Sequence, residues 1–308
     1  CTKTIELFIF CMKNIEKILK KKRLCQALTG VSPEKIYESL PYFEIELEKH
    51  DKKEKKSSKG RKTELANSLE KLFFILYYVK CYPTFDEAGF FFGVDKGTAN
   101  RWVHKYSKIL ESTLKAMMLL PARKPKKITD KLKKMKENNE EIFIDGTERP
   151  RRRPKNKDIQ KENYSGKKKR HTVKNLVITN RKKEILYLSN TVQGSMHDFV
   201  LMKETLVKNY LPSEMKVYVD TGFLGFQKLS PNLNIFMPKK KPKSRNLFQY
   251  EKNQNRKISK LRILVEHAIG GIKRLRGITD VFRNIKRGFS DLIMNICCGL
   301  WNLNLKKF

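Results

Sequence analysis

The chain has 308 residues, of which 39% are hydrophobic, and this allows a sizeable core in about two domains. No run reaches the roughly 18 apolar residues of a membrane-spanning helix, and the six cysteines form no CxxC pair, so zinc-site spacing is absent and a reducing compartment fits best. The 68 Lys and Arg residues against 32 Asp and Glu leave a formal net charge of +36.

This charge favours a nucleic acid as partner, because Lys and Arg neutralise phosphates and release their counterions. Two alternatives stay open at this point. A biased coding composition would also raise the lysine content, and a membrane surface would also attract cations. The basic residues are spread along the chain and not confined to one amphipathic helix, which favours a nucleic acid over a membrane.

Residues 1–62 are predicted to be a small helical region followed by a basic linker. The apolar run IELFIFCM is predicted to be part of a helix and not a signal peptide, because no basic flank precedes it and no small-residue cleavage signal follows it closely. Residues 48–62, EKHDKKEKKSSKGRK, lack apolar periodicity and are predicted to be the solvated linker.

Residues 63–120 are predicted to form a helix-turn-helix domain. It opens with ELANSLEKLFFILYYVKCY, which is long and apolar enough to be a core helix. Thr84 and Glu87 then have the spacing of a capping box at a helix start. Gly93 allows a turn, and Asp95 can cap a second helix that runs from about residue 96 to residue 110.

The second of these helices has a buried side and a basic side. A stripe at helical spacing is formed by Ala99, Val103, Tyr106 and Leu110. The opposite side carries Arg101, His104, Lys105 and Lys108. A helix-turn-helix places such a second helix in the major groove, so Arg101 and Lys105 are predicted DNA contacts. The alternative is an ordinary helical hairpin with a solvated charged face, and His104 is expected to be a surface histidine.

Residues 121–139 are predicted to be a second basic connector, and residues 140–308 an α/β domain with a mixed sheet. Helices are predicted at about residues 198–207 and 257–276. Five segments have the composition of strands: EEIFID (140–145), RHTVKNLVIT (170–179), EILYLSNTV (184–192), KVYVD (216–220) and NIFMP (234–238).

Three carboxylates in this domain have unusual settings. Asp145 and Asp220 each follow an apolar strand, at the strand end where α/β proteins usually bind ligands. Glu266 lies on the edge of the apolar stripe of the long helix, and Arg262 and Lys273 share its face by helical spacing. An intrahelical Arg262–Glu266 ion pair, worth about 0.3–0.5 kcal/mol, is the simpler explanation, but it leaves the two aspartates unexplained.

Three acids brought together would repel one another, and a divalent cation is the usual remedy. Carboxylate oxygens suit Mg²⁺ or Mn²⁺, which keep sites for water and phosphate oxygens. A pair of such ions promotes phosphodiester displacement. Asp145, Asp220 and Glu266 are therefore predicted to be metal-binding catalytic residues. Arg149 and residues 151–153, Arg151 included, follow Asp145 closely and are expected where a nucleic-acid backbone would pass.

Five segments in order carry a resemblance: FIDGTERP, YSGKKKRHTVKNLVI, GSMHDF, VDTGFLG and SKLRILVEHAIGGIKRLRG with the following FRN. Over residues 64–305 the chain resembles DDE-superfamily transposases of bacterial insertion sequences, in the endonuclease group related to PIF/Harbinger elements. The resemblance implies an RNase H-like fold and maps the acid triad onto Asp145, Asp220 and Glu266. Arg262 and Lys273 match the family's Arg, Glu, Lys signature, whereas Ser259 stands where related transposases often have Tyr.

The resemblance implies a transposase that binds terminal inverted repeats, cuts DNA with Mg²⁺ or Mn²⁺, and joins the freed 3′ end to target double-stranded DNA. It also implies a homodimer or larger synaptic assembly, no membrane partner, and a cytoplasmic location, with the nucleoid if the host is bacterial. Two alternatives remain: a domesticated or inactive DNA-binding regulator with the same fold, and a nuclease without strand transfer.

The remaining motif residues support weaker predictions. Lys168, Lys169 and Arg262, with Lys273, are expected to contact DNA, and residues 167–171 either grip phosphates or form a charged hairpin face. His197 and Asp198 are expected to start a helix, where the Asp198 carboxylate is favourable to the helix dipole. Neither is assigned to catalysis.

Overall fold

The computed structural model describes residues 15–53, 65–205 and 207–306. The apolar run near the N-terminus, predicted to be helical, lies outside these residues, as does most of the predicted linker. The chain divides into two compact units. A helical unit comprises the residues up to 120 with 273–280 and 284–308, and a sheet unit comprises 121–272 with 281–283. By this division residues 284–308, predicted to belong to the α/β domain, group with the helices.

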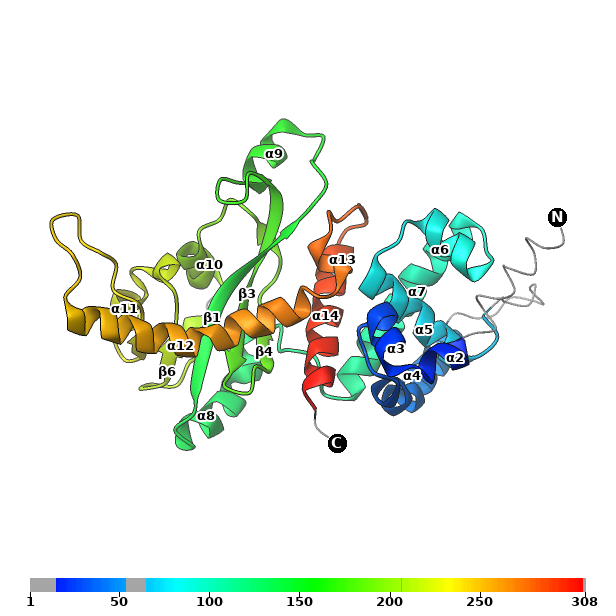
Figure 1. The fold of residues 1–308 in the computed structure, drawn as a ribbon, viewed down its shortest axis with the longest axis horizontal. Helices are drawn as coiled ribbons and strands as arrows, with labels where there is room; N and C mark the ends of the chain where they lie inside the picture. The colour runs from blue at the N-terminus through cyan, green and yellow to red at the C-terminus, as the bar shows by residue number, and fades with distance from the viewer. Residues whose placement is uncertain (1–14, 54–64, 206, 307–308) are drawn as a thin grey trace. The chain divides into compact units, whose positions relative to one another are not determined.

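The described part of the helical unit consists of helices around an apolar core (Figure 1). Helix α5, the predicted core helix, has seven buried residues in its 14, so its packing confirms the prediction from its apolar content. The predicted linker begins too early, because residues 48–53 continue α4. The helices are α2 (Ile15–Leu19), α3 (Lys22–Thr29), α4 (Pro33–Lys53), α5 (Ser68–Cys81), α6 (Phe85–Phe92), α7 (Lys96–Ala116), α13 (Arg276–Thr279) and α14 (Phe289–Leu305).

The helix-turn-helix is confirmed in α6 and α7. The Thr84 hydroxyl accepts from the Glu87 backbone N–H, and the Glu87 carboxylate accepts from the Thr84 N–H, which completes the capping box. Gly93 ends α6 in the left-handed region at φ +67°. The Asp95 carboxylate accepts from the Thr98 N–H and starts α7. All four residues of the predicted stripe on α7 are buried.

The sheet unit is built on a mixed sheet in the order β2-β3-β1-β6-β7, with β4 and β5 also paired to β3. β1 is antiparallel to β3 and parallel to β6, which is in turn parallel to β7. This is the RNase H-like arrangement that the family resemblance implies. The strands are β1 (Glu141–Pro150), β2 (Tyr164–Ser165), β3 (Arg170–Asn180), β4 (Ile185–Leu188), β5 (Val192–Gln193), β6 (Lys216–Tyr218) and β7 (Asn234–Phe236).

The helices of this unit cover the two faces of the sheet. Helix α12 lies across one face, as Figure 1 shows, and Phe143 of β1 packs there against Tyr218, Val265 and Ile269. The opposite face carries Ile142 and Ile144 in a larger core with side chains from α8 and α10. The helices and 3₁₀ turns are η1 (Pro125–Ile128), α8 (Thr129–Glu137), α9 (Lys157–Asn163), α10 (Asp198–Glu204), η2 (Val207–Tyr210), η3 (Thr221–Phe223), α11 (Phe226–Leu229) and α12 (Gln249–Ile272).

Three sequence predictions differ from this fold. Residues 121–139 are not a simple connector, because Leu132 and Met135 of α8 are buried in the core of the sheet unit. The first strand does not end at Asp145 but continues to Pro150, because β3 supplies hydrogen-bonding partners along its whole length. The long helix ends at Ile272, so Lys273 lies in a turn and helical spacing no longer relates its direction to that of Glu266.

Candidate catalytic site

Asp145 and Asp220 are brought together by the parallel pairing of β1 and β6. Phe143 is aligned with Tyr218 in the register, and each aspartate follows two residues later along its own chain. Side chains alternate between faces along a strand, so Asp145 lies on the face of Phe143, which is the face covered by α12. Asp220 follows β6 directly and its carboxylate accepts from the Gly222 backbone N–H at 2.6 Å.

The environment of Asp145 opposes its ionisation. Burial raises the pKa of this carboxyl to about 6, and the negative charge of Asp220 raises it further. The Gly146 N–H, which donates to Asp145 Oδ1 at 2.7 Å, and the Arg262 guanidinium both lower this pKa but offset only part of the effect. A carboxyl in this setting is stabilised as a carboxylate by additional positive charge.

Glu266 reaches the aspartate pair through Arg262. The Arg262 Nη2 atom lies 3.6 Å from Glu266 Oε1 and 4.0 Å from Asp220 Oδ2, so one guanidinium stands between the two acids. The Glu266 side chain is 54% exposed. The Arg262–Glu266 ion pair expected as the simpler explanation therefore exists, but the same guanidinium also serves Asp220.

A fourth carboxylate, which the sequence did not assign to the site, lies beside the aspartate pair. Asp198 is the first residue of α10, and its charge also raises the pKa of Asp145. It ion-pairs with Lys174 at 3.0 Å. The signal that could have found it is the GSMHDF segment, which carries an acid just before the helix that packs on the other face of β1.

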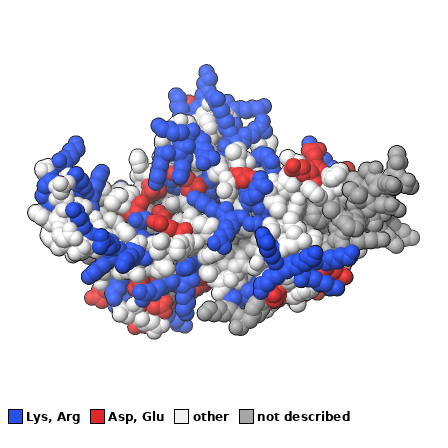
Figure 2. All heavy atoms as spheres, viewed as in Figure 1, with Lys and Arg blue, Asp and Glu red and all other residues white. Residues whose placement is uncertain are grey.

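The donor set suits a hard divalent cation, because it consists of carboxylate oxygens and carries more acids than it has cations to balance them. Within the described ranges no three His, Cys, Asp or Glu side chains already form a group that could hold a metal ion. Figure 2 shows acidic side chains gathered where β1, α10 and α12 lie, with Lys and Arg around them. The site thus combines carboxylates that repel one another with a basic surrounding surface.

Two family models match the chain. Residues 144–302 match the model described as DDE superfamily endonuclease, and residues 63–116 match the helix-turn-helix of DDE superfamily endonuclease. The chain belongs to the DDE superfamily of endonucleases. A probable transposase for insertion sequence element IS702 from Microchaete diplosiphon is 30% identical over 293 residues, which cover 94% of this chain and 98% of that protein. No solved structure matches significantly.

The helix-turn-helix of this DDE endonuclease implies DNA binding, and its predicted contact residues differ in their settings. Arg101 is exposed near the start of α7 and donates to the Thr98 hydroxyl at 2.6 Å. Lys105 pairs with Asp51 at 2.7 Å, so part of its charge is balanced within the protein. His104 is not a surface histidine, because its half-buried ring packs against Phe289 with ring centroids 4.4 Å apart.

The arginines after Asp145 divide into buried and exposed residues. Arg149, which the sequence placed along a nucleic-acid path, is only 2% exposed and donates to Asn175 Oδ1 at 2.8 Å. That prediction is wrong for Arg149, because pairing with β3 turns this position of β1 into the protein. Arg151 is half-buried and donates to Asn163 Oδ1 at 3.3 Å, and the next two arginines are exposed.

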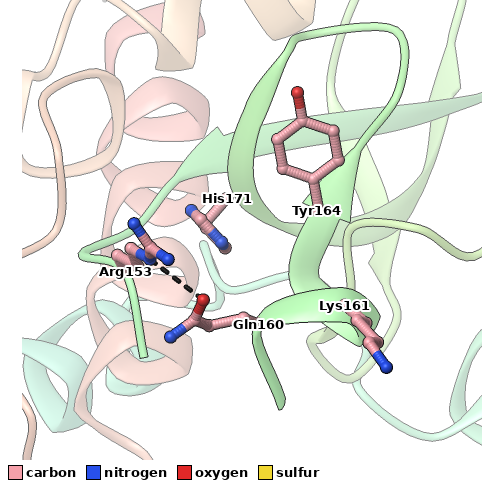
Figure 3. A pocket seen from close by; sticks show the side chains of 5 residues that line it. All are labelled: Arg153, Gln160, Lys161, Tyr164 and His171. Atoms are coloured by element: carbon pink, nitrogen blue, oxygen red, sulfur yellow. Dashed lines mark hydrogen bonds between the residues drawn. The ribbon is translucent and has the colours of Figure 1, made fainter. Parts of the chain in front are cut away.

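Residues 151–171 form a basic arm that comprises α9, β2 and the turn into β3. Lys168 and Lys169 are exposed in this turn. A pocket of about 530 Å³ on the arm is drawn in Figure 3, and in it the Arg153 Nε atom donates to Gln160 Oε1 at 3.0 Å. The other lining residues are Lys161, Tyr164 and His171. The pocket holds cations and rings, and the carboxylates described above do not line it.

No helix in the described residues of this endonuclease combines the length and the apolar character that crossing a membrane requires.

Proposed function

We propose that this chain is a DNA transposase that binds the terminal inverted repeats of its element through residues 64–112 and cuts DNA at Asp145, Asp220 and Glu266. The observation that carries the proposal is the pairing of Asp145 with Asp220 at aligned positions of β1 and β6, beneath the helix that bears Glu266. The pKa of Asp145, about 6, is what a carboxyl acquires where negative charge is concentrated and awaits a cation.

The three acids would hold Mg²⁺ or Mn²⁺ through their carboxylate oxygens. When bound, such ions supply activation of the attacking oxygen and stabilisation of the leaving oxygen in phosphodiester displacement. Glu266 joins the aspartates only if the Arg262 guanidinium leaves its place between Asp220 and Glu266. The exposed Glu266 carboxylate has room to turn, and the displaced guanidinium, like Lys273 on the following turn, is then available to a DNA phosphate.

The reaction has two steps. In the first, the oxygen of water forms a bond to a phosphorus at the element end, the bond from that phosphorus to the 3′ oxygen breaks, and a free 3′-hydroxyl results. In the second, this hydroxyl oxygen attacks a phosphorus of target DNA, whose own bond to a 3′ oxygen breaks. Asp145 and Asp220 orient the reacting phosphate, and the exposed cations of the basic arm, Lys168 and Lys169 among them, hold the DNA backbone. Both ends must react together, which requires a homodimer or larger assembly.

A nicking assay tests the cutting step. Terminal-repeat DNA with Mg²⁺ should be nicked by the wild-type chain and not by Asp145→Asn or Glu266→Gln, while Glu137→Gln, an exposed acid on α8, should nick at the wild-type rate. Tight binding without any nicking by the wild-type chain would instead identify a DNA-binding regulator. Undiminished nicking by Asp145→Asn would remove this site from the reaction.

The joining step needs a separate assay. Terminal-repeat DNA that already carries a free 3′-hydroxyl is incubated with a target plasmid, so that cutting is bypassed. We expect products in which the 3′ end is covalently joined to the plasmid, and we expect Asp220→Asn to abolish them. Nicking without joined products would identify a nuclease that lacks strand transfer.

A further inference from the structure

Asp198 approaches the aspartate pair from the face of the sheet opposite α12. Its helix, α10, places Leu201 and Met202 in the core that contains Ile142 and Ile144. Asp145 belongs to the other face, where Phe143 packs on α12. The two carboxylates therefore come from different layers of the sheet unit, and they interact at the level of β1.

Two glycines make this approach possible. Gly146 follows Asp145 in β1, and a Cβ atom at Gly146 would overlap the Asp198 carboxylate. A Cβ atom at Gly222 would lie 2.8 Å from Asp220 Oδ1 and 3.1 Å from Asp198 Oδ2. Neither glycine has a positive φ, so its backbone does not require glycine. Both positions instead leave the space that the Asp198 carboxylate occupies beside the aspartate pair.

The carboxylate of Asp198 is incompletely satisfied by the protein. Its Oδ1 atom is buried and accepts no hydrogen bond among the described residues, although Lys174 Nζ lies 3.0 Å away. That ammonium is shared, because it also lies 3.4 Å from Glu148 and donates to the Met196 carbonyl at 2.7 Å. The ion pair is real by distance, but its direction is not that of a hydrogen bond, so an acceptor oxygen is left over next to other acids.

From this geometry we infer that Asp198 is a further ligand of the divalent metal centre, alongside Asp145 and Asp220. The inference rests on the proposed function, since it concerns the same centre. Asp198 supplies a third carboxylate that is already in place, whereas Glu266 is separated from the aspartates by Arg262. The space beside Gly146 and Gly222 serves to admit this ligand.

Direct metal binding separates this role from a structural one. Free Mn²⁺ is measured by electron paramagnetic resonance while the full chain is titrated in the absence of DNA. Asp198→Asn should weaken Mn²⁺ affinity about tenfold or more, the scale at which the loss of a metal-site partner is usually felt. Glu148→Gln is the matched control, because it removes a carboxylate from the same Lys174 and should leave the affinity within about twofold. Equal affinity in Asp198→Asn and the wild-type chain overturns the inference.

Gly146→Ala tests the same point without removing a carboxylate. The added methyl should push the Asp198 side chain aside and weaken Mn²⁺ binding as Asp198→Ala does. In the Asp198→Ala background the glycine substitution should add little, because its target is already gone. If Gly146→Ala weakens binding equally in both backgrounds, its effect is local to Asp145 and the inference fails.

Two controls keep these results interpretable. The melting temperature of each variant without metal shows that it folds, and the rise of that temperature with added Mn²⁺ repeats the affinity ranking. Asp145→Asn tests the proposed function separately. If the wild-type chain binds no Mn²⁺, or if Asp145→Asn binds as well as the wild type, the proposed centre itself fails; a loss in Asp145→Asn with none in Asp198→Asn rejects only the role of Asp198.

Discussion

Arg149 and Arg152 lie three residues apart in a run of arginines and have different environments. Arg149 is 2% exposed, and its guanidinium donates to Asn175 Oδ1 and Thr191 Oγ1. Arg152 is exposed just beyond β1. Because the strand continues past Asp145, the first of these arginines becomes part of the interior and the second part of the surface. A charge run therefore contains residues of two kinds.

Substitutions should separate these two kinds. Arg149→Ala should cost about 2–5 kcal/mol of unfolding free energy, the range of large-to-small changes in a core, and it leaves buried polar partners behind. Arg152→Ala should change stability by less than about 0.5 kcal/mol and weaken DNA binding. Denaturant unfolding and a DNA-binding titration measure the two effects. A stable Arg149→Ala protein with weakened DNA binding would contradict the buried assignment.

His104 shows how a residue on a predicted basic face becomes part of the packing. Its ring lies against Phe289 of α14, and its Nε2 atom is 3.3 Å from Asn284 Nδ2. Burial lowers the pKa of His104, and the charges of Lys286 and Lys108 lower it further. The folded protein therefore holds this imidazole neutral at pH values where the unfolded chain would protonate it.

The direction of this shift predicts a loss of stability in mild acid. The folded pKa lies below the ordinary value of 6.5, so the unfolded state binds more protons as the pH falls through that range, and stability falls with it. His104→Phe keeps an aromatic ring against Phe289 but cannot be protonated. The melting temperature of the wild type should therefore fall more than that of His104→Phe as the pH is lowered through this range. Parallel curves would show that His104 does not couple folding to pH.

At the scale of elements, the helix-turn-helix depends on close approach of the backbone as well as on caps. A Cβ atom at Gly89 would lie 2.6 Å from the Val94 carbonyl oxygen, which is fixed backbone of the turn. The Val94 N–H donates to the Gly89 carbonyl at 2.9 Å across the same turn. Gly93 supplies the positive φ that the sequence predicts, whereas Gly89 supplies the space. The second requirement is visible only when the two helices are placed.

Gly89→Ala should therefore open the turn. The backbone neighbour cannot move as a side chain would, so the variant should unfold at lower denaturant and bind terminal-repeat DNA more weakly. Gly270→Ala in α12 is the control, because a Cβ there meets nothing within 4 Å and alanine favours a helix by about 0.5–1 kcal/mol. A Gly89→Ala protein as stable as wild type would show that the turn has more room than its geometry indicates.

At the scale of the whole molecule, positive charge and the few acids are arranged differently. Figure 2 shows Lys and Arg over much of the visible face, with acidic side chains gathered where β1, α10 and α12 lie. A net charge of +36 makes binding to any DNA favourable at low salt. Sequence preference needs base contacts, and Arg101 of α7 is the exposed predicted candidate.

The salt dependence of binding should show which lysines neutralise the DNA backbone. Lys167→Ala with Lys168→Ala, on the basic arm, should reduce the slope of log affinity against log salt by about 0.9 for each phosphate that the arm no longer neutralises. Lys133→Ala with Lys134→Ala on α8 removes the same charge from exposed positions of another element. If both pairs lower the slope equally, net charge alone drives binding and the arm has no special part.

Much of this protein was determined by the sequence itself. The capping box at Thr84, the caps at Asp95 and Gly93 and the buried stripe of α7 depend on residues a few positions apart, so local physics decides them. The five strands and the α/β class follow from runs of apolar residues in the same way. Motifs in a fixed order were enough to indicate the DDE superfamily, which the family models confirm.

Tertiary structure decided what depends on partners distant in sequence. The extension of β1 to Pro150 comes from pairing with β3, and it buries Arg149. Asp198 becomes a neighbour of Asp145 and Asp220 only because α10 packs on the sheet and two glycines leave space. Arg262 stands between Asp220 and Glu266 for the same kind of reason. Distances between segments far apart in the chain are set by packing and register, and no local pattern of residues contains them.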